Sequence, residues 1–286
     1  MLKIAILGCE NSHADAFIKL IQAEKYPNLE VVGVYTDDEA ANERMRENYG
    51  VYTAKSYDEF VGSVDGVMIT ARHGDNHLKY ALPYIETGMP IFIDKPATAS
   101  VEDARKFAAL LEKYKNPFSG GSSCILTPEV LDLKDKIASG KHGNVIGGML
   151  RAPIDLKNPY GDFWFYAQHL VQIMQETFGY YPESVKAFKR EGGVNCIYRY
   201  PDYDVYAEFV NGNYLYHVSA SCEKAILHTD INVSSDIFAY EMDDYYSILI
   251  GMESTFTLSD FFAPVFVIDA TIRAINSGNE EKIDRL

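Results

Sequence analysis

The sequence predicts an α/β fold: an N-terminal Rossmann-type, doubly wound parallel sheet, then a C-terminal α+β domain with a large, mostly antiparallel open sheet. Over residues 1–120, short β-branched runs alternate with stretches of helical apolar spacing, as in a parallel sheet covered by helices. From Gly143 onward, strand-like runs follow one another with few helical stretches. The 286 residues fit two domains, which we expect at 1–120 and 121–286.

Four apolar runs in the first half show little polar alternation, which is typical of strands buried on both faces. These predicted strands are 3–7, 30–35, 66–70 and 90–93. Helical spacing of apolar residues predicts helices at 12–24, 38–47, 76–86 and 101–114. The stretch Ser119-Gly120-Gly121-Ser122-Ser123 is expected to be the domain junction.

The second half begins with a helix that Thr127-Pro128 opens and Gly140 ends, with proline at the favoured first position. Predicted strands follow at 145–152, 183–190, 195–200, 205–210, 214–221, 225–233 and 235–240. Asn211-Gly212-Asn213 is a hairpin signal, and helices are expected at about 166–178 and 260–276. Aromatic residues in the strands indicate that the sheet face without helices is also buried, against a second subunit of a homodimer or homotetramer.

The charge balance excludes several partner classes. The 26 basic and 41 acidic residues give a net charge of −15, which argues against nucleic acid or an anionic membrane as a partner. Four scattered cysteines indicate reduced thiols, and no metal-binding spacing is present. Glu10 interrupts the apolar start too early for a signal peptide, and no apolar stretch reaches the roughly 20 residues that span a bilayer. We expect a cytoplasmic protein.

Asp94-Lys95-Pro96 follows the apolar run Pro90-Ile91-Phe92-Ile93 directly. Open α/β sheets bind ligands outside the carboxyl ends of their strands, where this tripeptide is expected. The proline fixes the chain direction and removes one backbone donor. Lys95 is therefore the first candidate for chemistry.

The turn after the first strand reads Gly8-Cys9-Glu10-Asn11-Ser12-His13, where a G-x-G-x-x-G phosphate turn belongs. Only the first glycine is present. The segment is either a modified dinucleotide turn that uses the helix N-terminus, or an ordinary turn capped by Ser12. After the second strand, Asp37 either holds the adenine-ribose hydroxyls or shares a helix-capping role with Asp38. No lysine or arginine stands there, which favours NAD over NADP without excluding NADP.

Two further segments carry polar side chains near the same expected edge or on a helix. Thr70-Ala71-Arg72 and His77 follow the third strand, and Arg72 either reaches a phosphate or substrate carboxylate or belongs to a surface loop. His169 lies on a largely apolar helix and is either a core histidine or the proton acceptor that hydride transfer from a hydroxyl-bearing carbon requires.

Together these features resemble the Gfo/Idh/MocA family of NAD(P)-dependent oxidoreductases over essentially the whole chain. The Glu-Lys-Pro motif of that family is Asp94-Lys95-Pro96 here. The resemblance implies that Lys95 bridges nicotinamide and substrate, and that His169 is the acid or base. It also implies two sets of contacts. Gly8, Asn11, Ser12, His13, Thr36, Asp37, Thr70, Arg72, His77, Lys95 and Pro96 would contact the cofactor, and Arg72, Arg151, Asp162, Trp164 and Tyr166 the substrate.

The expected activity is hydride transfer between NAD(P) and a hydroxyl of a sugar or cyclic polyol. The sequence departs from the family pattern at Glu10 and His13, which replace glycines, and at Cys124, which replaces an arginine. Phe165 stands four residues before His169, where the family often has aspartate. These departures motivate an alternative: a dinucleotide- or sugar-binding sensor or partner protein on the same scaffold. A third interpretation is a lyase or hydrolase that uses NAD transiently.

Overall fold

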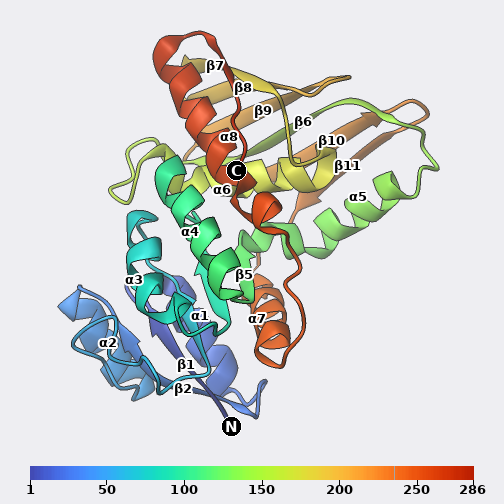
Figure 1. The fold of residues 1–286 in the computed structure, drawn as a ribbon. Helices are drawn as coiled ribbons and strands as arrows, with labels where there is room; N and C mark the ends of the chain where they lie inside the picture. The colour runs from blue at the N-terminus through green and yellow to red at the C-terminus, as the bar shows by residue number, and fades with distance from the viewer. Residues whose placement is uncertain (235) are drawn as a thin grey trace. The chain divides into compact units, whose positions relative to one another are not determined.

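The computed structural model describes residues 1–234 and 236–286 and contains two compact units (Figure 1). The first unit comprises Met1–Gly121 and Phe238–Leu258, and the second comprises Ser122–Ile237 and Ser259–Leu286. The chain thus enters the second unit after Gly121 and returns to the first for residues 238–258. No helix within the described ranges is long and apolar enough to cross a membrane.

The first unit is built on a five-stranded sheet, and every strand pair in it is parallel. The strand order is β2-β1-β3-β4-β5, which is the doubly wound arrangement expected from the sequence. The strands are β1 (Leu2–Leu7), β2 (Leu29–Tyr35), β3 (Gly66–Ile69), β4 (Ile91–Asp94) and β5 (Phe118–Gly121). The connecting helices are α1 (Ser12–Gln22), α2 (Glu39–Tyr49), α3 (Asp75–Ile85) and α4 (Val101–Tyr114).

Helix α7 (Ile237–Leu249) corrects one expectation. The strand predicted at 235–240 starts at a position outside the described residues, and from Ile237 onward the chain is helical. Met242 and Tyr245 are fully buried and pack in one core cluster with Phe17 of α1 and Ile4 of β1. The two residues are three positions apart and so share one face of α7. Because that face packs with Phe17, α7 covers the same face of the parallel sheet as α1.

The second unit is built on a seven-stranded sheet of order β11-β10-β6-β9-β8-β7-β12, in which only β6 and β9 pair in parallel. Its strands are β6 (Val145–Ile154), β7 (Ser184–Arg190), β8 (Gly193–Arg199), β9 (Asp204–Asn211), β10 (Tyr216–Cys222), β11 (Ile226–Ile231) and β12 (Glu280–Lys282). Its helices are the 3-10 turn η1 (Ser123–Leu126), α5 (Pro128–Ala138), α6 (Phe163–Phe178) and α8 (Leu258–Ser277).

The hairpin expected at Asn211-Gly212-Asn213 does not form. Strands β9 and β10 are not neighbours, because β6 lies between them and pairs with both. Gly212 does make a left-handed turn, with φ of 69°, but the turn connects strands on either side of β6. Local turn chemistry alone could not reveal the intervening strand.

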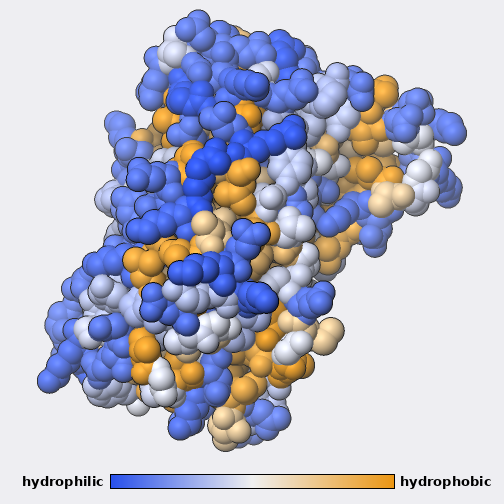
Figure 2. Space-filling view, viewed as in Figure 1, coloured by the Kyte–Doolittle hydropathy of each residue, from blue (hydrophilic) through white to orange (hydrophobic). Residues whose placement is uncertain are grey.

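Helices α6 and α8 cover one face of this sheet. A Cβ atom on Gly148 of β6 would lie 2.3 Å from the ring of Phe178. Because glycine has no Cβ atom, α6 can pack directly on the strand here. On α8, Thr271 Oγ1 is 2.9 Å from the buried hydroxyl of Tyr198 on β8. Met149, Phe188 and Tyr206 are exposed from strands of the same sheet. Figure 2 also shows hydrophobic residues at the surface in the strand region of this unit.

Candidate active site

The turn after β1 brings three strand ends together at the carboxyl edge of the parallel sheet. Gly8 has φ of 96°, and a Cβ atom there would lie 2.1 Å from the backbone nitrogen of Ala71. Its own N–H donates to Tyr35 O at 2.7 Å, and Thr70 Oγ1 donates to Gly8 O at 3.2 Å. Only glycine satisfies both the left-handed backbone and this close approach.

Asn11 rather than Ser12 is the N-cap of α1. Its side-chain oxygen accepts from the N–H of His13 at 3.3 Å, and its amide donates to Asp94 Oδ2 at 3.3 Å. Ser12 is exposed, so the expected capping role of Ser12 is wrong. The longer asparagine side chain can satisfy the helix terminus and reach the end of β4 at the same time.

Asp94 organises the end of β4. Its carboxylate is fully buried, with Oδ2 2.7 Å from His13 Nδ1 and Oδ1 accepting the backbone N–H of Lys95 at 2.7 Å. Burial opposes ionisation, but the electrostatic interaction and hydrogen bond with His13, together with the Lys95 ammonium, outweigh it and hold the pKa of Asp94 below its ordinary value. The carboxylate therefore joins the turn that begins α1 to the segment that carries Lys95.

Lys95 lies at the sheet edge that the sequence predicted. The residue is 4% exposed, and the Lys95–Pro96 peptide bond is cis. A lysine this deeply buried has lost most of its hydration, and its ammonium is correspondingly dependent on the groups around it. Its place directly after β4 is where ligands bind in open parallel sheets.

The two aspartates after β2, Asp37 and Asp38, make different contacts. Asp38 is the N-cap of α2, accepting from the N–H groups of Ala40 and Ala41. Asp37 is exposed and accepts from the hydroxyls of Tyr35 and Tyr80, with the Lys79 ammonium 3.9 Å away. The hydrogen bond from Tyr35 is the main cause that lowers the pKa of Asp37. Only Asp38 therefore takes the capping role.

Thr36 is buried at the same end, and its hydroxyl donates to Glu10 Oε2 at 2.7 Å. The other oxygen of Glu10 accepts the backbone N–H of Arg72 at 2.9 Å. Glu10 is thus directed along the carboxyl edge of the sheet and ties the end of β2 to the loop after β3. Sequence reasoning identified Glu10 as a departure from the glycine pattern but missed this bridging contact.

His77 has a different place from the one expected. It is fully buried in the first turn of α3, with Nε2 2.7 Å from Ala71 O. Burial lowers its pKa, so the neutral imidazole is favoured. Thr70 is also fully buried. Both side chains contact the backbone of the turns at Gly8 and Ala71 and are not exposed at the sheet edge.

In the second unit, His169 lies on α6 and is 7% exposed. Its Nδ1 is 2.7 Å from the hydroxyl oxygen of Ser122 and 3.5 Å from the sulfur of Cys124. The backbone N–H of Ser122 donates to Gln172 Oε1 at 2.6 Å. Ser122 and Gln172 were missed by sequence reasoning, although Gln172 follows His169 by three residues and therefore shares its helix face.

Of the four residues expected to contact substrate in this unit, three lie on or just before α6 and one lies on the opposite face of the sheet. The ring of Tyr166 is 6.0 Å from that of His169, and Trp164 is half-buried two residues earlier on the same helix. Asp162 is exposed immediately before α6. Arg151, by contrast, alternates with Leu150 and Ala152, which are buried, and pairs with Glu208 at 3.4 Å. It points to the sheet face opposite α6 and therefore lies away from His169.

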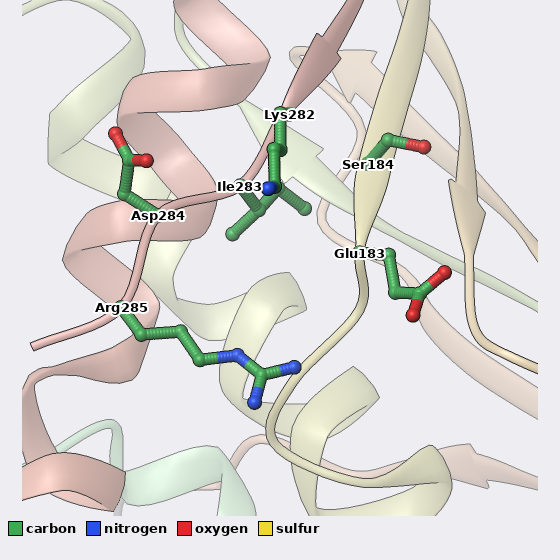
Figure 3. Close-up of a pocket in the computed structure, with 6 residues that line it drawn as sticks. All are labelled: Glu183, Ser184, Lys282, Ile283, Asp284 and Arg285. Carbon is green, nitrogen blue, oxygen red and sulfur yellow. The ribbon is translucent and has the colours of Figure 1, made fainter.

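The ring of Phe165 lies 5.8 Å from that of Tyr160 and 4.9 Å from that of Tyr166. A separate groove of about 640 Å³ lies between the segment before β7 and the chain end (Figure 3). Its charged residues are Glu183, Lys282, Asp284 and Arg285, and none of the expected site residues lines it.

Within the described residues, no group of three or more His, Cys, Asp or Glu side chains is arranged to hold a metal ion.

The parallel sheet with its Gly8 turn matches a known protein family. Residues 2–122 match the family model GFO_IDH_MocA, described as an oxidoreductase family with an NAD-binding Rossmann fold. Over these residues the chain is similar to the Gfo/Idh/MocA oxidoreductases. A curated relative, the rhizopine catabolism protein MocA of Rhizobium meliloti, is 29% identical over 127 residues. That match covers 44% of this chain and 40% of the relative, so it spans less than half of either protein.

Solved structures share the fold of the whole chain. The scyllo-inositol dehydrogenase of Lactobacillus casei, solved with NAD(H) and scyllo-inositol, has a TM-score of 0.86 at 14% identity, with 99% of each chain covered. The WlbA dehydrogenase of Chromobacterium violaceum, solved with NADH and UDP-GlcNAcA, has a TM-score of 0.81 at 13% identity. There the match covers 99% of this chain and 96% of the other. At such low identities, the likeness shows the fold alone and not the substrate.

Proposed function

We propose that this chain is an NAD-dependent oxidoreductase that transfers a hydride between the nicotinamide and a hydroxyl-bearing carbon of a sugar or cyclic polyol. The observation that carries the proposal is Lys95, which is buried at the carboxyl end of β4 beside the family's phosphate turn. Polyol chemistry is supported by the inositol dehydrogenase of the same fold.

The residues of the first unit fit a dinucleotide. Gly8 closes the turn against Ala71, and the N-terminus of α1 begins directly after it with Asn11 as cap. A helix N-terminus favours an anionic group, so Ser12 and the partly buried His13 are the candidates to contact the pyrophosphate. Arg72 follows β3 and Pro96 follows β4, the next two strands along the same sheet edge, and they complete the proposed set. When bound, NAD supplies the hydride acceptor or donor.

The roles of the chain's own residues follow from their chemistry. The Lys95 ammonium orients the substrate hydroxyl and stabilises negative charge as its proton leaves. His169 takes that proton at its imidazole, with Nδ1 held at the Ser122 hydroxyl. Tyr166 and Trp164 offer aromatic surfaces for a sugar ring, and Asp162 offers an acceptor for its hydroxyls.

The test is a titration of the purified protein with NADH and NADPH, followed by nicotinamide fluorescence, and then a turnover screen on inositols, sugars and nucleotide sugars. We expect saturable NADH binding and reduction of NAD by at least one polyol. Failure to bind either dinucleotide, with the protein folded, would contradict the proposal.

Phe165 favours a second candidate, a dinucleotide- or sugar-binding sensor or partner protein. A phenylalanine packed on Tyr160 and Tyr166 cannot transfer a proton. The sensor function predicts ligand binding with no reduction of NAD by any polyol in the same screen, which separates it from the dehydrogenase.

We also propose that the chain forms a homodimer or homotetramer through the open sheet of the second unit. Met149, Phe188 and Tyr206 are exposed hydrophobic residues on its strands. Exposed apolar surface of this kind is typical of protein interfaces, and a second copy would bury it.

A further inference from the structure

Glu10 stands at the position of the second glycine in the G-x-G-x-x-G turn of dinucleotide-binding proteins. Its two carboxylate oxygens contact different strand ends: Oε2 accepts from the Thr36 hydroxyl after β2 at 2.7 Å, and Oε1 accepts from the Arg72 N–H after β3 at 2.9 Å. Thr36 is buried, so the carboxylate is fixed at the end of β2 rather than directed into solvent. This end of β2 is where the adenine ribose lies in dinucleotide-binding sheets.

Asp37 is the residue that the sequence offers for the ribose, but its carboxylate is engaged elsewhere. One oxygen accepts from Tyr35 and the other from Tyr80 at 3.1 Å. The rings of Tyr35 and Tyr80 pack edge to face with centroids 5.6 Å apart, which holds both hydroxyls on Asp37. The Lys79 ammonium, 3.9 Å away, offsets its negative charge.

We propose that Glu10, and not Asp37, is the carboxylate that binds the adenine-ribose hydroxyls and selects NAD over NADP. This inference rests on the proposed function. A carboxylate accepts about four hydrogen bonds, so the two described contacts of Glu10 leave room for the two hydroxyls of a ribose. Asp37 also has two such contacts, but the Lys79 ammonium offsets its charge, so it would repel a 2′-phosphate less. A 2′-phosphate in the same place would put its charge against the Glu10 carboxylate, whose described partners are the Thr36 hydroxyl and the Arg72 N–H.

The experiment compares Glu10→Gln with Asp37→Asn in the full chain by fluorescence titration with NADH and with NADPH. Both variants remove a charge and keep the side-chain shape, so Asp37→Asn is the matched control. We expect Glu10→Gln to weaken NADH binding about tenfold and to reduce the preference for NADH over NADPH by at least that factor. Asp37→Asn should leave that preference within about twofold of wild type.

A second variant, Glu10→Gly, restores the glycine of the common turn and covers the case in which the glutamine variant folds poorly. The inference predicts that it too loses the preference for NADH. Tighter binding of both dinucleotides by Glu10→Gly with the preference unchanged would show that Glu10 obstructs the cofactor and would overturn the inference.

An altered preference in Asp37→Asn together with an unaltered one in Glu10→Gln would also overturn it and return the role to Asp37. In both cases wild-type protein binds NADH, so the proposed function stands. If wild-type protein binds neither dinucleotide, the proposed function and this inference fail together.

Discussion

The Nδ1 atom of His169 lies 2.7 Å from the hydroxyl oxygen of Ser122, and both residues are buried. Ser122 Oγ also accepts the backbone N–H of Cys124 at 3.3 Å, and when Nδ1–H donates to the same oxygen, Nε2 is the nitrogen that can accept a proton. Such a contact fixes the orientation and tautomer of a histidine. Ser122 is therefore a positioning residue for the proton acceptor that we propose.

Ser122→Ala should lower kcat about tenfold, because a buried imidazole nitrogen loses its partner at a cost of roughly 1–3 kcal/mol. The pH profile of kcat should shift, while the dissociation constant for NADH stays unchanged. Ser122→Thr keeps the hydroxyl and should restore most of the activity. An unshifted pH profile in Ser122→Ala would remove Ser122 from the mechanism.

Lys95→Met should lower kcat by about 10²–10³-fold, because methionine has similar length but cannot stabilise negative charge at the substrate hydroxyl. The measurement is steady-state turnover of a polyol identified in the screen, with thermal unfolding as the check on folding. Lys106→Met on the exposed side of α4 is the matched control and should behave as wild type. Activity within a few-fold of wild type in Lys95→Met would exclude the lysine role.

His13→Ala should reduce the free energy of unfolding by about 1–3 kcal/mol, because the fully buried carboxylate of Asp94 loses a partner at 2.7 Å. Urea unfolding measures this change. His13→Gln keeps a hydrogen-bond donor and should recover part of the loss. Equal stability of His13→Ala and wild type would show that Asn11 and the Lys95 N–H suffice for Asp94.

His77 predicts a pH-dependent stability. Its folded-state pKa is lowered below 6.5 by burial, so the unfolded chain binds the proton more readily. Stability should therefore fall as the pH decreases from 6.5 toward the lowered folded pKa, by at most about 1.4 kcal/mol per pH unit. The measurement is the difference in unfolding free energy between wild type and His77→Gln across this window. A difference that does not vary with pH would contradict the assignment.

Tyr206→Glu should shift the oligomer toward monomer, because a charge on the exposed sheet face would have to be buried in the proposed interface. Sedimentation velocity at several protein concentrations measures the change. Tyr240→Glu, at an exposed tyrosine of α7, is the control. A monomeric wild-type protein, or an unaltered oligomer in Tyr206→Glu, would contradict an interface on this face.

Much of the first unit follows from the sequence alone. Buried parallel strands have uninterrupted apolar runs, so β1, β2, β3 and β4 are visible as patterns, and the residue after each strand lies at the edge where ligands bind. For this reason the strand pattern by itself locates Lys95 at that edge. The helix that carries His169 is also predictable, because the helical spacing of its apolar residues is visible within one short segment of the sequence.

The tertiary structure decided what depends on partners distant in the sequence. Strand β6 lies between β9 and β10, so a good hairpin sequence connects strands that do not pair. Helix α7 returns to the sheet of the first unit, where its apolar residues are buried. Glu10 meets Thr36 and Arg72, Asp37 meets Tyr80, and Ser122 meets His169. Composition and periodicity report which face of an element is apolar, but a hydrogen bond between residues tens of positions apart is set by how the elements pack.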